Sequence, residues 1–153
     1  MLAIGDDFHI ENDQGERVYK IDGKAMRLRK TISFENERGD RLFKIQSRVL
    51  RIKDTMEIED PDGRRVALVK KALVTPLRER WDVDLDDGED LKAQGNVVDH
   101  EYAISRGDDE IATVSKRWFR VRDTYGVEIA PGENHALVLA VVAVVDAMAH
   151  PDR

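Results

Sequence analysis

The sequence predicts a mainly β protein, a closed antiparallel barrel of about 12 strands around a central hydrophobic α-helix at the C-terminal end. Two observations support this fold: a strand-turn-strand repeat of about 24 residues, and one apolar run near the C-terminus without a polar face. The 153 residues suffice for one domain of ordinary size. We therefore expect residues 1–153 to form a single barrel domain, with strands over about 5–130 and the helix over about 134–149.

An apolar anchor residue marks each unit of the repeat. Turn chemistry follows most anchors, as in Asn12–Gly15, Glu37–Asp40 and Asp60–Gly63. Gly, Asn and Asp supply the positive φ angles and the side-chain hydrogen bonds that tight hairpins need. Each unit is therefore expected to be a strand, a tight turn and a returning strand. The anchors are Ile10, Phe34, Ile58, Val83, Ile104 and Val127.

Side chains alternate with a period of two within the units. Leu28 and Phe34 fall on one face of a strand, and Arg27 and Arg29 fall on the other. Segments 41–45, 66–69 and 111–114 are expected to be returning strands. Regular turn signals at this spacing indicate a sandwich or a barrel, and closure into a barrel would remove the exposed sheet edges.

The apolar run favours the barrel. It extends over residues 136–149 with Asp146 as its single charged residue, and Asn134 is expected to cap its N-terminus. A helix that is apolar all round must be enclosed, and a barrel of about 12 strands leaves room for one. Two alternatives remain: a helix that caps one end of a sandwich, and a buried strand, because Val is a weak helix former. The run is too short for a transmembrane helix.

Composition excludes several classes of protein. The net charge of −6 argues against a nucleic-acid binder, and the absence of Cys excludes a disulfide framework, a thiolate zinc site and a Cys nucleophile. The first residues lack the features of a secretory signal. We expect a cytoplasmic protein that is able to lie peripherally at a membrane.

Positive charge recurs at one level of the predicted barrel. Residues 17–80 carry a net charge of +8, whereas residues 81–153 carry −9. Bases recur seven and five residues before the anchors, out of phase with the inward side chains. Such an outer basic belt would bind an anionic phospholipid headgroup or a phosphorylated ligand, and the alternative is a solvated strand face. The belt comprises Arg27, Arg29, Arg51, Lys53, Arg78, Arg120 and Arg122.

A column of ionisable residues lies four positions before the anchors. Strict alternation would place it inside the barrel, where charges are costly unless they are paired. The column therefore forms either a polar tier with ion pairs or a set of bulges that turn its members outward. We favour bulges, predict no metal site, and interpret His100 as a partly exposed strand residue. The column comprises Asp6, Lys30, Asp54, Glu79, His100 and Asp123.

Catalytic motifs are absent from the sequence. The His residues form no HExxH pair, no Ser lies in a nucleophile elbow, and no Gly-rich loop precedes a helix. Trp81, Trp118 and Phe119 are interpreted as packing residues. We predict a protein that is not an enzyme and needs no cofactor.

Four stretches resemble the LURP-one-related family, which belongs with the tubby C-terminal domain and the phospholipid scramblases in one structural superfamily. They are Gly5–Phe8, Tyr19–Ala25, Asp99–Tyr102 and above all Ser115–Ile129, and the likeness covers residues 4–149. The resemblance implies a tubby C-terminal-like barrel of twelve strands around a central hydrophobic helix. Tubby-like domains bind phosphoinositides, scramblases are linked to lipid movement and calcium, and many LURP-one-related proteins have no assigned activity.

These observations favour a non-enzymatic binding or scaffold module whose partner is an anionic lipid or a phosphorylated ligand. The first alternative is a protein-interaction or regulatory domain without a lipid ligand. The second is a scramblase-like, membrane-active protein, which would require the C-terminal helix to leave the barrel. We expect no nucleic-acid partner and no transmembrane span.

Overall fold

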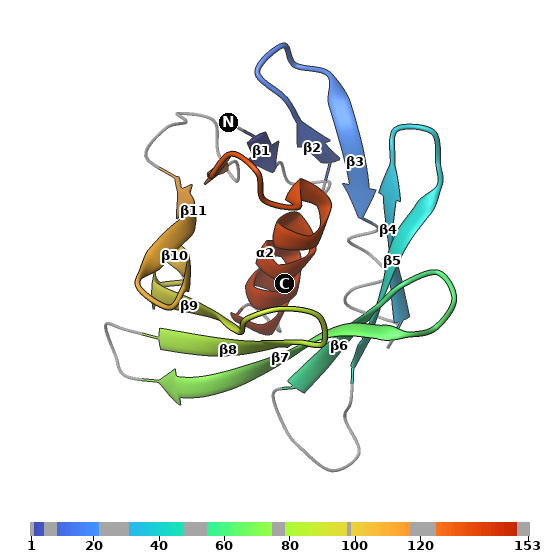
Figure 1. The fold of residues 1–153 in the computed structure, drawn as a ribbon. Coiled ribbons are helices and arrows are strands. Elements are labelled where there is room, and N and C mark those ends of the chain that lie inside the picture. Colours follow the sequence, from blue (N-terminus) through green and yellow to red (C-terminus); the bar gives the residue numbers. More distant parts are fainter. Residues whose placement is uncertain are drawn as a thin grey trace.

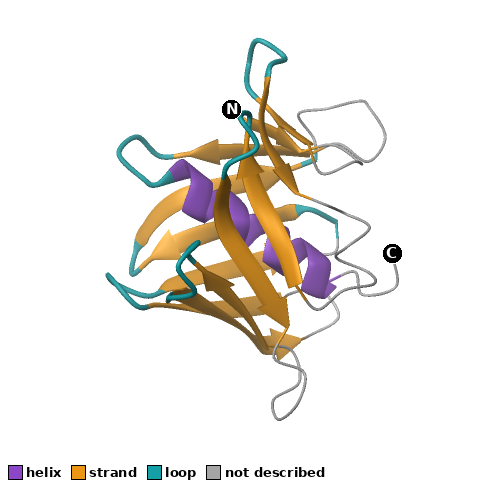
Figure 2. Ribbon diagram, turned by 90° about the vertical axis from the view of Figure 1, so that its right-hand side faces the viewer, coloured by secondary structure: helices purple, strands orange, loops and turns teal. Residues whose placement is uncertain are grey.

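The computed structural model describes residues 2–4, 9–21, 31–47, 55–74, 79–97, 99–116 and 125–149. In these ranges the chain forms β-strands that surround the helix α2 (His135–Ala149), as Figures 1 and 2 show. The strands are β1 (Leu2–Ile4), β2 (His9–Glu11), β3 (Arg17–Ile21), β4 (Thr31–Asn36), β5 (Arg41–Ser47), β6 (Thr55–Glu59), β7 (Arg65–Val74), β8 (Glu79–Leu85), β9 (Leu91–Asn96), β10 (Glu101–Arg106), β11 (Asp109–Ser115) and β12 (Tyr125–Ile129).

The described strands pair with their neighbours in sequence, and each pair is antiparallel. β1 lies between β12 and β2, with Leu2 opposite Val127 and Ile4 opposite Ile10. Around the sheet the strands follow the order β1, β12, β11 and so on down to β2, which pairs with β1. The sheet therefore closes into a barrel. The prediction of a mainly β, antiparallel protein with a C-terminal helix is confirmed.

Three hairpins at one end of the barrel, here called the turn end, repeat one hydrogen-bonding pattern. Asn12 Oδ1 accepts hydrogen bonds from the backbone N–H groups of Gln14 and Glu16 at 3.0 Å. The side chains of Asn36 and Asp60 accept bonds in the same way, at 2.9–3.0 Å. This side-chain capping lets a short loop reverse the strand. The predicted turn chemistry is confirmed at these hairpins.

The anchors of the repeat form the inner face of the strands. Ile10, Phe34, Ile58, Val83, Ile104 and Val127 are all 0% exposed, as is Trp81. The strand register shifts directly after four of these anchors, as between Ile58 and Glu59. Such a bulge bends the strand at the turn end and increases the local twist. The inward face predicted from alternation is therefore confirmed at the anchors.

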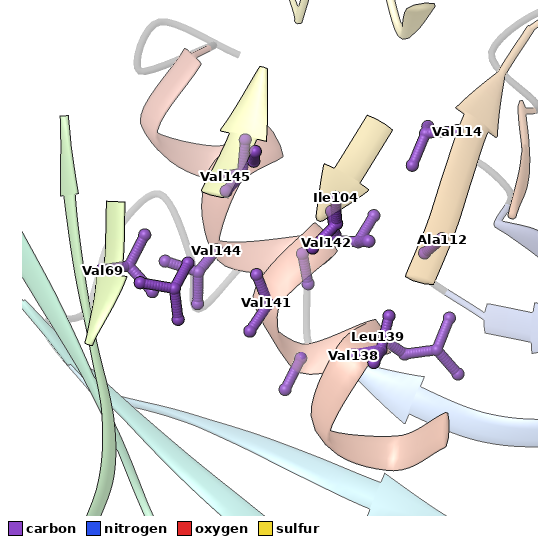
Figure 3. Close-up of a cluster of buried hydrophobic side chains, with 14 of the residues drawn as sticks. Val69, Ile104, Ala112, Val114, Val138, Leu139, Val141, Val142, Val144 and Val145 are labelled. Atoms are coloured by element: carbon purple, nitrogen blue, oxygen red, sulfur yellow. The ribbon is translucent and has the colours of Figure 1, made fainter. Parts of the chain in front are cut away.

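α2 occupies the space inside the strands. Its residues from Val138 to Asp146 are at most 3% exposed, and valines project from several sides of the helix toward the surrounding strands (Figure 3). Asn134 Oδ1 accepts a hydrogen bond from Leu137 N–H at 3.1 Å, so the predicted N-cap is confirmed. The alternative of a buried strand is wrong. Among the described residues, no helix combines the length and the apolar character needed to cross a membrane.

Candidate functional site

The predicted basic belt lies outside the described residues. This applies to every member: Arg27, Arg29, Arg51, Lys53, Arg78, Arg120 and Arg122. On the described strands, outward bases face acids across the sheet. Lys70 Nζ lies 2.8 Å from Asp84 Oδ2, and Arg65 Nε lies 3.0 Å from Asp86 Oδ1. The described ranges hold 13 of the 25 Lys and Arg residues and 25 of the 31 Asp and Glu residues, so this part of the chain is acidic.

Buried polar side chains gather at the end of the barrel opposite the turn end, here called the polar end. They lie at the starts of β6 and β8, in the turn before β10, at the end of β11 and near the C-terminus of α2. Burial removes such groups from water, so each of them is costly unless another polar group lies beside it. The buried polar residues of the described ranges are Thr55, Glu57, Glu79, His100, Ser115 and Asp146.

His100 and Asp146 form the centre of the polar end. His100 Nδ1 lies 3.2 Å from Asp146 Oδ1, and both side chains are almost completely buried. The imidazole stacks on the ring of Tyr125, with centroids 4.2 Å apart and planes inclined by 11°. The pair therefore links the turn before β10, the start of β12 and the last turns of α2.

A tight turn presents the imidazole to the helix. His100 N–H donates to the carbonyl oxygen of Val97 at 3.0 Å. With φ at 54°, His100 is the one non-glycine residue of the described ranges in the left-handed region. That conformation is unfavourable for a residue with a Cβ, and it persists where surrounding contacts over-determine it. The stack and the carboxylate supply such contacts.

Tyr102 adds a phenol to this cluster. Burial, together with the negative charge of Asp146, raises the pKa of Tyr102 well above its usual value of 10.0. The phenol therefore stays protonated at neutral pH and is available as a hydrogen-bond donor. Its Oη has no hydrogen-bond partner within the described part of the chain.

Further polar contacts surround the central pair. Ser115 Oγ donates to the carboxylate of Glu101 at 2.9–3.0 Å, and Lys116 N–H donates to Glu101 Oε1 at 3.2 Å. On the neighbouring strands, Lys71 Nζ lies 5.5 Å from the centre of the buried Trp81 ring, a cation–π contact. These contacts join the ends of β7, β8, β10 and β11 around the polar end.

The polar column of the sequence is partly inside the barrel. Glu79 and His100 are 8% and 5% exposed, so the prediction of bulges that turn them outward is wrong for both. His100 is also a buried turn residue rather than a partly exposed strand residue, because Asp146 on α2 pairs with it. The other members, Asp6, Lys30, Asp54 and Asp123, lie outside the described residues.

Asp146, Tyr102 and Tyr125 are the parts of this site that the sequence did not reveal. One signal pointed to Asp146, a single acid in an apolar run that must be enclosed. Its partner His100 could not be predicted, since the two residues are far apart in sequence. In the described ranges, no three His, Asp or Glu side chains converge as metal ligands. The cluster is closed to solvent, and its contacts hold α2 against the strands.

An open groove of about 430 Å³ lies along β11 and β12 and the turn after them. Exposed Glu110 and Glu128 line it, together with Thr113 and Pro131. The buried residue Ala112 also belongs to its lining. The groove has an acidic rim and is the accessible concave feature of this region.

Comparison with known proteins identifies the family. The model of the family described as LURP-one-related matches residues 1–146. No curated protein matches the chain. The X-ray structure of a protein from Arabidopsis thaliana is similar, with a TM-score of 0.70 and 16% sequence identity over 95% of this chain and 88% of that chain. That likeness shows a shared fold. Because the family match spans nearly all of the sequence, this chain belongs to the LURP-one-related family.

Proposed function

We propose that the protein is a non-enzymatic binding or scaffold module that recognises its partner through its outer surface. The supporting observation is that, in the described part of the chain, α2 lies inside the strands and is buried there. α2 is buried from Val138 to Asp146, and the strand residues around it, such as Val69 and Ile104, are 0% exposed. Small-molecule sites are concave cavities of several hundred Å³, and α2 occupies the space that the strands would otherwise enclose. Recognition is therefore left to the outside.

The sharper form of this proposal is recognition of an anionic phospholipid headgroup or a phosphorylated ligand by the outer basic belt. Two features of the sequence support this form of the proposal, namely the distribution of its charged residues and the positions of the belt residues. The ranges outside the described residues hold 12 Lys and Arg against 6 Asp and Glu, so the positive charge of the chain is concentrated there. Belt residues also recur at the same positions of successive repeats. Arg binds phosphate oxygens through two parallel hydrogen bonds, and Lys binds them as a point charge.

Flotation with vesicles tests this proposal. The full chain is mixed with phosphatidylcholine vesicles, or with the same vesicles containing phosphatidylserine or a phosphoinositide. We expect recovery with the acidic vesicles, loss of recovery in the double variant Arg51→Gln, Lys53→Gln, and competition by a soluble inositol phosphate if the headgroup alone is recognised. The matched control is Arg64→Gln, Arg65→Gln, which removes two exposed bases at the turn end. Equal recovery with neutral and acidic vesicles would contradict the proposal.

The second candidate is a protein-interaction module. The acidic balance of the described ranges and the groove rimmed by Glu110 and Glu128 favour a basic protein segment as the partner. Pull-down with the immobilised chain at moderate salt tests this candidate. Capture should weaken in Glu110→Gln, Glu128→Gln and persist in the control Glu37→Gln, Asp62→Asn, which changes exposed acids at the turn end. Equal capture by all three proteins would count against the groove.

A further inference from the structure

We propose that the buried contact between His100 and Asp146 sets the register of α2, meaning the rotation and axial position of the helix inside the strands. From Val138 to Val145 the helix is apolar and buried on every side. Apolar burial is non-directional, and cores of similar apolar volume tolerate alternative packings. A helix built from Val, Ala and Leu therefore has several positions of similar burial available to it.

Asp146 removes this degeneracy. It is the only Asp, Glu, Lys or Arg of α2, and its side chain is 3% exposed, with Oδ1 3.2 Å from His100 Nδ1. A shift of one residue rotates a helix by about 100° and would carry the carboxylate away from the imidazole. Since a buried charge without its partner is costly, only one position of α2 satisfies the pair. A single buried polar residue fixes register in coiled coils by the same means.

His100 is held firmly enough to act as the reference point. Its backbone is fixed in the left-handed region by the hydrogen bond to Val97, and its ring lies flat against Tyr125. Tyr102, on β10 shortly after His100, is also buried, and burial together with the charge of Asp146 raises the pKa of its phenol. The strand side of the contact is therefore rigid, and the helix must adjust to it.

Valine contacts around α2 report its register. Val142 lies toward Ile104, whereas Val144 lies toward Val69 on the opposite side of the helix (Figure 3). α2 packs against β7, the strand that carries Val69. In a helix that is rotated by one position these neighbours change, so the methyl signals of Val142 and Val144 distinguish the native register from others.

The test uses methyl NMR of the full chain with labelled valines, alongside urea unfolding. Asp146→Leu should unfold cooperatively but show more than one set of Val142 and Val144 signals and lose the Val144–Val69 contact. Asp146→Asn should keep one set, because its amide still places a polar oxygen beside His100 Nδ1. The matched control is Val145→Ala, which should lower the urea midpoint while one native set of signals remains.

A second variant keeps the proposal testable if Asp146→Leu does not fold. His100→Gly combined with Asp146→Leu removes both polar groups, and Gly suits the positive φ at position 100. Several sets of signals in this double variant support the proposal. One native set with the Val144–Val69 contact, in either variant, overturns it. If neither variant folds, the pair acts through stability rather than register, and the proposal also falls.

Discussion

At the residue scale, Gly95 shows how closely the strands meet at the polar end. Its φ is 144°, and a Cβ there would lie 2.7 Å from the carbonyl oxygen of Glu101 and 2.8 Å from the Cα of Tyr102. These are backbone atoms, which cannot move aside without breaking the β9–β10 pairing. The position of Tyr102 beside Asp146 therefore depends on the absence of a side chain at position 95.

Gly95→Ala is expected to lower the free energy of unfolding by about 2–4 kcal/mol, because it adds a backbone clash to an unfavourable φ. The matched control is Gly63→Ala at the turn end, where φ is 86° and nothing lies within 4 Å of the added Cβ. There we expect a loss of about 1 kcal/mol from backbone strain alone. Urea unfolding of both variants measures the difference, and similar losses would show that the close approach is not rigid.

Other residues mark the limit of sequence reasoning. The anchors Phe34 and Ile58 were predictable, because a period of two assigns each side chain to one face of a strand. His100 was not, since the same period breaks down in a turn with positive φ. The side of α2 that carries Asp146 toward His100 depends on helix rotation, and an all-apolar helix contains no pattern that encodes its rotation.

At the element scale, α2 is fixed at both ends by polar contacts. Near its N-terminus, Arg106 on β10 makes two hydrogen bonds to the carboxylate of Glu133, at 2.8 and 3.1 Å. Near its C-terminus, Asp146 contacts His100. The N-cap at Asn134 was predictable because capping is local in sequence. The Arg106–Glu133 pair was not predictable, because Arg106 lies on a strand that is distant in sequence from Glu133.

The Arg106–Glu133 pair makes part of the stability depend on pH. The hydrogen bond from Arg106 holds the pKa of Glu133 below its usual value of 4.5. Because the folded-state pKa is lower than the unfolded-state pKa, the contribution is present above pH 4.5 and is lost as the pH falls through the folded-state pKa. Glu133→Gln should therefore be less stable than the natural chain at about pH 6 and approach it at about pH 3. Urea unfolding at both values checks this, and a difference that does not change with pH would refute it.

At the scale of the whole molecule, the two ends of the barrel differ in origin. The turn end depends on contacts between residues that are close in sequence, made by Asn, Asp and Gly residues that recur with the repeat. It was therefore predictable. The polar end forms only when β6, β8, β10, β11 and α2 come together. The sequence allows an inward polar tier or outward bulges there, and in the structure Glu79 and His100 are buried, with Asp146 beside His100.

This arrangement also bears on the scramblase-like alternative, which requires α2 to leave the strands. Departure would expose the apolar residues from Val138 to Val145 and separate Asp146 from His100. We therefore expect the amides of Val141 and Val142 to exchange with deuterium only through global unfolding, with the free energy that urea unfolding gives. Acidic vesicles should leave their exchange rates unchanged. Acceleration of about tenfold or more by such vesicles, without loss of protection at the β4 and β5 amides, would mean that α2 leaves an otherwise intact barrel at the membrane.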